Sequence, residues 1–241
     1  MTAERTFVAV LSPHFDDAVL SCWHVLSAPG PVVVVNVFAG APPSGWPLGW
    51  WDQRTGATDS AARAHERERE DDAALGVAGR SPINLDLLEA QYRREPASVD
   101  LVVERIARAV GPCDVLYAPA VLGAHVDHVL VRDAALRLGS EGARVRLYAD
   151  LPHGLSRGWP TWVTADGRAE VDAAWARALS HAVPECNVLH PYVHALTADE
   201  QRRKLEAVRA YRTQLDELDA MAFAPLHRSL HYEVVWELAP A

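Results

Sequence analysis

The sequence predicts an α/β fold with a doubly wound, mostly parallel sheet and helices on both of its faces. Strand-like apolar runs alternate with helix-like segments along the chain. The first runs, FVAVL (7–11) and VVVVNVF (32–38), are continuously apolar, as is typical of parallel strands buried on both faces. The length of 241 residues suits a single domain over 1–241, without repeats or linkers.

The first two strands and the segment between them form a predicted βαβ unit. A helix is expected within residues 16–28, closed by Pro29-Gly30. The next segment, 39–58, is rich in Gly and Pro and predicts a long loop near the candidate site. Its three tryptophans are read either as anchors of the loop on the core or as substrate contacts; they are Trp46, Trp50 and Trp51.

A charged helix is predicted after this loop, over residues 59–75. Asp59 or Ser60 caps its start, and Gly76 is expected to end it in a left-handed conformation. Its charge run, HEREREDD, indicates a solvated face on which Arg67 pairs with Asp71 one turn later.

The remaining elements follow from the same patterns. Further strands are expected at 83–88, 114–119, 144–150 and 232–238, the last at an edge of the sheet. Helices are expected from Ser98 to Gly111-Pro112, over 127–138, and from Thr197 to about 218. Thr197 and Glu200 have the spacing of a capping box.

Composition limits the classes of function. The net charge of −9 argues against a protein that binds nucleic acid or an anionic membrane surface. The three cysteines, Cys22, Cys113 and Cys186, form no CxxC pair, which favours a reducing cytoplasm over a disulfide scaffold. No secretory signal or membrane-spanning run is recognisable.

Two polar clusters carry the chemistry. SPHFDD, with His14, Asp16 and Asp17, follows the first strand, and AHVDH, with His125 and His128, follows the strand at 114–119. Ligands of open α/β sheets bind beyond the carboxyl ends of strands. If these two strands are neighbours, the clusters face each other there.

Histidine and carboxylate side chains in this pattern favour a catalytic zinc site with an open position. Neighbouring carboxylates point apart, so one of Asp16 and Asp17 is a metal ligand and the other is free to accept a proton. His14 and His128 supply the nitrogen ligands, and His125 stays near the open position as a donor to an oxyanion or leaving group. Asp127 either orients a ligand histidine or caps its helix.

These motifs resemble those of the PIG-L/LmbE family of zinc-dependent N-deacetylases. The family carries a PHPDDE-type motif after its first strand, here PHFDDA (13–18), and a later HPDH-type motif, here HVDH (125–128). Three weaker matches extend the resemblance over nearly the whole chain: HERERED with ALG (65–71 and 74–76), YADLP (148–152) and KLEAVRAYRTQ (204–214).

The resemblance implies a Rossmann-like fold and one metal ion per chain, Zn²⁺ or another divalent metal. It implies His14, Asp17 and His128 as ligands, Asp16 as the general base and His125 as the electrostatic stabiliser or acid. The implied activity is hydrolysis of an N-acyl, most simply N-acetyl, group on an amino sugar or glycoside-like small molecule. Aromatic loop residues suit a ring-bearing substrate.

The chain departs from the family pattern at several positions. Phe15 stands where the usual motif has Pro. Ala18 stands where the usual motif has Glu, which removes a carboxylate from the support of the metal site. Gly123 stands where some members place a Tyr, so an oxyanion donor must come from elsewhere. The candidates are Tyr92, Tyr192, His153 and His194, and the last two are also candidate substrate contacts.

Three alternatives stay open. The first is an amidase that acts on a thiol-sugar conjugate. The second is a serine hydrolase, because GLSRG (154–158) matches GxSxG, although Pro160 disfavours the helix that a nucleophile elbow needs. The third is a non-catalytic binding relative.

His190 and His194 are spaced like a helical metal pair, but Pro191 between them argues for loop or pocket residues. The oligomeric state is not readable from the sequence.

Overall fold

A computed structural model describes residues 6–140, 142–156, 158–183, 191–222 and 224–238. One seven-stranded sheet forms its centre, in the order β3-β2-β1-β4-β5-β7-β6. The first five strands in that order are parallel, and the last two join antiparallel. The strands are β1 (Val8–Ser12), β2 (Val32–Asn36), β3 (Pro82–Asn84), β4 (Val115–Pro119), β5 (Arg144–Tyr148), β6 (Tyr192–Ala195) and β7 (Tyr232–Glu237). The predicted fold class is confirmed.

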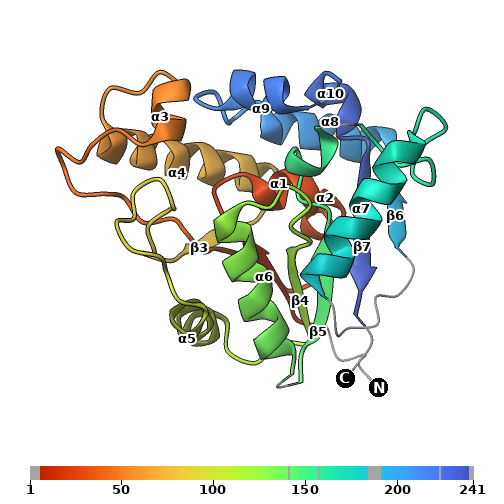
Figure 1. The fold of residues 1–241 in the computed structure, drawn as a ribbon, viewed down its shortest axis with the longest axis horizontal. Helices are drawn as coiled ribbons and strands as arrows, with labels where there is room; N and C mark the ends of the chain where they lie inside the picture. The colour runs from red at the N-terminus through yellow and green to blue at the C-terminus, as the bar shows by residue number, and fades with distance from the viewer. Residues whose placement is uncertain (1–5, 141, 157, 184–190, 223, 239–241) are drawn as a thin grey trace.

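Helices cover both faces of the sheet (Figure 1). The longer ones are α4 (Ser60–Val77), α5 (Val99–Val110), α6 (Val126–Gly139), α7 (Ala169–Ala182) and α8 (Ala198–Val208). The shorter ones are α1 (Asp17–Ser21), α2 (Trp23–Leu26), α3 (Trp50–Arg54), η1 (His153–Leu155), α9 (Leu215–Met221) and α10 (Leu226–Ser229). The helices α5 and α6 pack together on one face, and α4 packs against α8 on the other.

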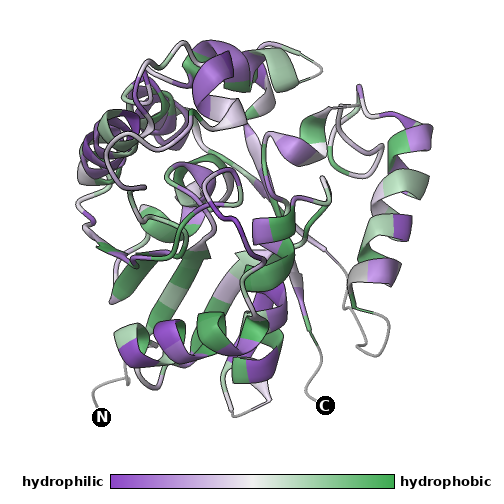
Figure 2. Ribbon diagram, turned by 60° about the vertical axis from the view of Figure 1, so that its left-hand side comes forward, coloured by the Kyte–Doolittle hydropathy of each residue, from purple (hydrophilic) through white to green (hydrophobic). Residues whose placement is uncertain are grey.

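The core lies where the apolar strands meet these helices. Figure 2 shows mainly hydrophobic central strands beneath helices with mixed outer faces. The middle residues of β1 and β4 are almost completely buried, as the continuous apolar runs predict. In the described residues, no helix is long and apolar enough to cross a membrane.

Several local predictions are confirmed. Asp59 caps α4, Ser98 caps α5, and Thr197 with Glu200 forms the capping box of α8. Gly111 ends α5 with a positive φ of 65°.

Two predicted helices are interrupted by distant carboxylates. The helix expected within 16–28 breaks at Cys22, because Glu233 accepts the backbone N–H groups of Trp23 and His24 at 2.7 and 2.9 Å. The helix expected to run to about 218 leaves its axis after α8, where Glu70 accepts hydrogen bonds from the backbone N–H and the hydroxyl of Thr213. At each break the carboxylate accepts backbone N–H groups that have no partner within a helix.

Three further predictions are wrong in detail. The loop 39–58 contains α3, whose first N–H groups are accepted by the side-chain oxygen of Gln91. The left-handed residue after α4 is Gly79 at φ 69°, not Gly76, because the helix continues through Val77. The last strand, β7, is not an edge strand, since the unpredicted four-residue β6 pairs outside it.

The buried carboxylate of Glu233 forms an ion pair and also connects β7 with α2. Besides the two backbone groups of α2, the Glu233 carboxylate accepts from Lys204 Nζ at 2.6 Å and lies 2.6 Å from His24 Nδ1. Both Lys204 and Glu233 are fully buried. Burial raises the pKa of Glu233, but the Lys204 ammonium and His24 outweigh that effect and lower it to about 2, from an ordinary value of 4.5.

We therefore expect a specific acid sensitivity. Because the pKa of Glu233 is lower in the folded chain, its stabilising effect is complete above about pH 4.5 and is lost as the pH falls towards about 2. Glu233→Gln should lower the free energy of unfolding by about 3–5 kcal/mol near neutral pH, since Lys204 is left buried and unpaired. Urea unfolding of the parent and the variant should show that the difference in their free energies of unfolding becomes smaller as the pH is lowered.

A matched control is the double variant Lys204→Met with Glu233→Gln, which removes the unpaired charge and should recover part of the loss. A gap between parent and Glu233→Gln that stays constant across the acid range would contradict this account.

Candidate metal centre

The two polar clusters meet at one end of the sheet. The strands β1 and β4 are parallel neighbours, as expected, so the turns that follow them lie side by side. His14 Nε2 lies 3.0 Å from Asp127 Oδ2, and His128 Nε2 lies 3.4 Å from Asp17 Oδ2. Residues more than a hundred positions apart in sequence are therefore in direct contact.

The turn after β1 aims its two carboxylates in different directions. The Ser12 hydroxyl donates to the His14 carbonyl at 2.7 Å and accepts the Ala18 N–H at 3.0 Å. Asp17 Oδ2 accepts the His14 N–H at 2.9 Å and faces the imidazoles. Asp16 has a φ of 156°, which is unusual for a residue other than glycine, and it lines the pocket without a hydrogen bond or ion pair to these imidazoles in the described part of the chain.

The distances from Asp17 to two imidazoles match the spacing of ligands around a tetrahedral metal ion. Asp17 Oδ2 lies 3.5 Å from His14 Nδ1 and 3.4 Å from His128 Nε2. Ligand bonds of about 2.0–2.2 Å at tetrahedral angles place ligand atoms about 3.3–3.6 Å apart. His128 Nε2 is also buried, and it has no hydrogen-bond partner in the described part of the chain. A metal ion would satisfy this nitrogen, so the donor set fits the group that the sequence suggests.

Further carboxylates hold the two imidazoles. Asp127 contacts His14 Nε2, and Asp150 Oδ2 lies 3.2 Å from His128 Nδ1. Carboxylates in these positions orient ligand histidines and raise their basicity. Asp150 was not predicted, although its place just after β5, at the same end of the sheet as β1 and β4, is a usable signal.

Asp127 contacts the site and does not cap α6. The N-cap is His125, whose Nδ1 accepts the Asp127 N–H at 3.3 Å. The Asp127 carboxylate is held by Arg93 Nη2 at 2.5 Å and by the Ala90 N–H at 2.9 Å. Of the two interpretations left open by the sequence, the contacts agree with the orienting one.

A second ligand set uses nitrogen atoms only. His14, His125 and His128 each offer a ring nitrogen, and these atoms lie within 4.8 Å of one another. The two sets share His14 and His128 and differ in whether Asp17 or His125 completes them.

The charges around His14, Asp17 and His128 favour a bound cation. Burial opposes charging of His128, but Asp17 and Asp150 raise its pKa to about 9. Burial would likewise raise the pKa of Asp17, yet His128 and His14 hold it well below its usual range. Burial and the Asp17 charge raise the pKa of Asp16 well above its usual range. The field that retains a proton on His128 also favours a metal cation there.

His125 is positioned as a neutral donor. Burial and the neighbouring imidazoles of His14 and His128 lower its pKa to about 3. Because Nδ1 accepts the Asp127 N–H, the proton of the neutral ring is on Nε2. The His125 Nε2–H group takes no part in capping α6.

A pocket of about 290 Å³ opens beside these side chains. Six residues of the two polar clusters and of η1 line it: His14, Asp16, Asp17, His125, Asp127 and His153. Trp50 and Trp51 from α3, with Leu218 and Met221 of α9, line a wall of it.

Two predicted substrate contacts lie elsewhere. Trp46 stacks under the Arg94 guanidinium, 4.5 Å from its ring centroid, and does not line the pocket. His194, on β6, stacks on His24 with ring centroids 3.8 Å apart. His190 and Cys186 lie outside the described residues.

The charged helix α4 does not present a purely solvated face. Arg67 is only 3% exposed, and instead of pairing with Asp71 it donates to Asp52, Glu89 and the Tyr92 hydroxyl at 2.6–2.9 Å. Asp71 is also buried. The prediction was wrong because these partners come from α3 and from the segment after β3. The resulting network fixes α3, and with it the tryptophan wall.

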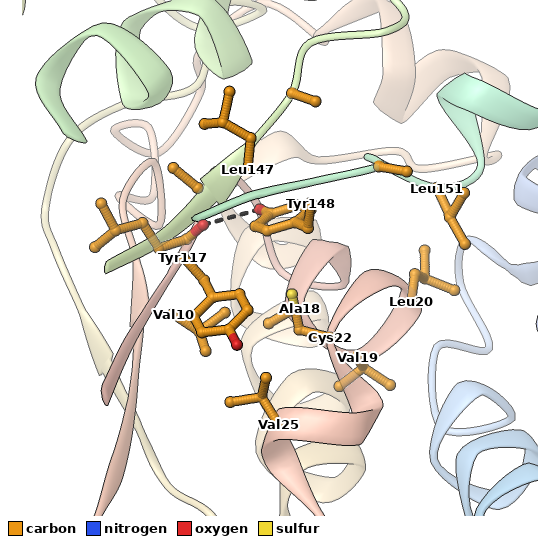
Figure 3. Close-up of a cluster of buried hydrophobic side chains, with 14 of the residues drawn as sticks. Val10, Ala18, Val19, Leu20, Cys22, Val25, Tyr117, Leu147, Tyr148 and Leu151 are labelled. Atoms are coloured by element: carbon orange, nitrogen blue, oxygen red, sulfur yellow. Dashed lines mark hydrogen bonds between the residues drawn. The ribbon is translucent and has the colours of Figure 1, made fainter. Parts of the chain in front are cut away.

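Two of the departures from the family pattern, at Ala18 and Gly123, have structural counterparts. Ala18 packs in an apolar cluster with Val10, Tyr117 and Tyr148, where a carboxylate would be unpaired (Figure 3). Asp127 and Asp150 supply carboxylate support from other elements. At Gly123, a Cβ atom would lie 2.5 Å from the Cβ of His153, so a tyrosine cannot be accommodated as the chain stands.

The GLSRG stretch lacks the geometry of a nucleophile elbow. Gly154 and Leu155 lie in the 3-10 helix η1, and the exposed Ser156 caps its end. No strand leads directly into the stretch, and the next described helix begins only at Ala169. Arg157 lies outside the described residues.

The sheet, with its histidine- and aspartate-bearing turns after β1 and β4, has the fold of PIG-L/LmbE-type N-deacetylases. The resemblance seen in the sequence is therefore confirmed. No family model matches the chain.

Individual relatives make the likeness more specific. The chain is 32% identical to 2'-N-acetylparomamine deacetylase of Streptomyces fradiae over 157 residues, which are 60% of this chain and 56% of that enzyme. The match thus spans little more than half of the relative's length. The crystal structure of A40926 pseudoaglycone deacetylase superimposes with a TM-score of 0.70 at 25% identity, covering 98% of each chain.

A third likeness concerns the fold. The zinc-inhibited form of teicoplanin deacetylase superimposes with a TM-score of 0.69 at 24% identity, covering 98% of this chain and 99% of that one.

Metal analysis tests the site directly. After loading with zinc and dialysis, we expect about one metal ion per chain in the parent, and its loss in His128→Ala, because an imidazole ligand is removed. Asp150→Asn should weaken metal affinity by about 10–100-fold, because it disturbs only the support of His128. Elemental analysis and competition with a chelator measure both effects.

The two ligand sets are separated by one further comparison. If Asp17 is the third ligand, Asp17→Asn should lose metal while His125→Gln retains it. The reverse result would assign His125 to the metal, and undiminished metal in His128→Ala would refute the site.

Proposed function

We propose that the chain is a metal-dependent hydrolase that removes an N-acetyl or similar N-acyl group from an amino sugar or a glycoside-like small molecule. The observation that carries this proposal is the position of Asp16. Its carboxylate lines the pocket immediately beside a donor set with metal-ligand spacing, without being part of that set. A metal site with an adjacent free carboxylate is an arrangement that suits amide hydrolysis by an activated water molecule.

We assign His14, Asp17 and His128 to hold the ion, with Asp127 and Asp150 orienting the imidazoles. Zinc suits these ligands, although other divalent metals bind such sets. When bound, the metal supplies Lewis acidity, which lowers the pKa of water towards about 7 and polarises the acyl carbonyl.

The protein's own groups move the protons. Asp16 accepts a proton from the attacking water as oxygen bonds to the acyl carbon. His125 donates a hydrogen bond from its Nε2–H group to the acyl oxygen while negative charge develops on that oxygen. The proton taken by Asp16 passes to the amide nitrogen as the carbon–nitrogen bond breaks. The products are a free amine and a carboxylic acid, which becomes the carboxylate by losing its proton to solvent, so one water molecule is consumed.

The pocket wall supports a ring-bearing substrate. Trp50 is 53% exposed and lines the pocket together with Trp51, and aromatic faces of this kind can pack on a sugar ring or an aglycone. The relatives named for 2'-N-acetylparomamine and A40926 pseudoaglycone also act on sugar-bearing molecules. We therefore place the substrate of this chain among N-acylated amino sugars of small natural products.

The role of Asp16 is tested by a conservative variant. Asp16→Asn should keep the bound metal but lower kcat by about 10²–10⁴-fold, because only the proton acceptor is lost. Acetate release from a panel of N-acetylated amino sugars and aminoglycosides measures kcat, and elemental analysis measures the metal.

Ser156→Ala is the matched control and should leave turnover unchanged. Full turnover in Asp16→Asn would remove Asp16 from this role. Loss of turnover in Ser156→Ala, together with insensitivity to chelators, would favour the serine hydrolase instead.

A further inference from the structure

One imidazole in the pocket has no part in the proposed ligand set. His153, at the start of η1, lines the pocket beside the two histidines of the HVDH motif. Its ring centroid lies 5.0 Å from that of His128 and 5.8 Å from that of His125, while the rings of His125 and His128 are 5.2 Å apart. The three rings therefore form a triangle, of which the His125 and His153 rings line the pocket while His128 is buried.

The ring nitrogens of His153 are available to a ligand. No hydrogen bond joins them to any residue that the structure describes, whereas Asp127 holds His14 and Asp150 holds His128. Because His153 lines the pocket, a bound ligand can supply the hydrogen-bond partner that this polar ring lacks among the described residues.

Gly123 provides the space that His153 occupies. A Cβ at this position would come within 2.5 Å of the His153 Cβ and 3.0 Å of its Cγ. The backbone of Gly123 does not have a positive φ, so available space, and not conformation, is what requires glycine here.

Other candidate oxyanion donors are engaged or distant. The Tyr92 hydroxyl is tied to Asp52 and Arg67 in the buried network. Tyr192 and His194 lie on the edge strand β6, outside the pocket lining. His153 is the one of the four that lines the pocket.

We propose that His153 is a further catalytic residue, which donates a hydrogen bond to the acyl oxygen of the substrate together with His125. This inference rests on the proposed deacetylase function. In this proposal the acyl oxygen is bound on the pocket side of the His125 and His153 rings, and the two imidazoles share the charge that develops on it. No atom is transferred to or from His153 in this role, since it donates the same hydrogen bond throughout.

Kinetics of two substitutions test the role. His153→Ala should lower kcat by about 10²–10³-fold with a much smaller change in KM and with unchanged metal content. His153→Gln, which retains an N–H donor, should recover part of kcat. His181→Ala, on the exposed face of α7, is the matched control and should behave like the parent.

A binding measurement gives a readout that does not depend on turnover. The probe is a methylphosphonamidate analogue of N-acetylglucosamine, whose tetrahedral phosphorus carries anionic oxygens. By calorimetry, the analogue should bind His153→Ala at least about tenfold more weakly than the parent, while N-acetylglucosamine itself should lose little affinity.

A double-mutant cycle links His153 to its space. Gly123→Ala should displace the ring and lower kcat, although it removes no functional group. In the double variant with His153→Ala the two losses should not add, because the displaced ring is already gone.

The possible failures are distinct. If the parent deacetylates but His153→Ala matches it in kcat and in binding of the analogue, the inference is wrong and the proposed function stands. Metal loss in His153→Ala would make this residue a ligand and also overturn the inference. If the parent releases no acetate from any substrate, the proposed function fails, and analogue binding that is equal or absent in parent and variant overturns the role of His153.

Discussion

The parallel pairing of β1 with β4 is the constraint on which the site depends. It brings two turns separated by about half the chain to the same end of the sheet, so that Asp17 meets His128 and Asp127 meets His14. Each strand is apolar and buried, which fixes its register and therefore the height at which its polar turn begins. The catalytic chemistry we propose needs side chains held to a few tenths of an ångström, and a buried parallel sheet supplies that rigidity.

Burial of charge is the second theme, and it is balanced by pairing. Glu233 and Lys204 are buried against one another, and Arg67 is surrounded by acceptors from two other segments. Such groups are costly to bury alone, so each determines where distant segments must lie. Glu233 divides α1 from α2, and the Arg67 network holds α3 in place. Much of the architecture outside the sheet is thus specified by electrostatics.

The sequence was informative where structure is local or periodic. Apolar runs predicted the central strands, and short capping patterns at Ser98 and Thr197 predicted helix starts, because these signals depend on neighbouring residues alone. The resemblance to a known family added the ligand assignment. The partners of Arg67, the break at Cys22 and the support from Asp150 were missed, since each requires residues that are distant in sequence. The strand β6 was missed because four residues after a proline carry too little pattern.

The wall of the pocket is built separately from its floor. The floor comes from turns anchored in the sheet, whereas α3 is fastened to α9 by Trp51 with Gln214 and by Arg54 with Glu217. Surface substitutions on these two short helices can reshape what enters the pocket without moving a residue of the metal centre. Such a division allows the substrate preference to change through α3 and α9 while the residues proposed to carry out the chemistry stay in place.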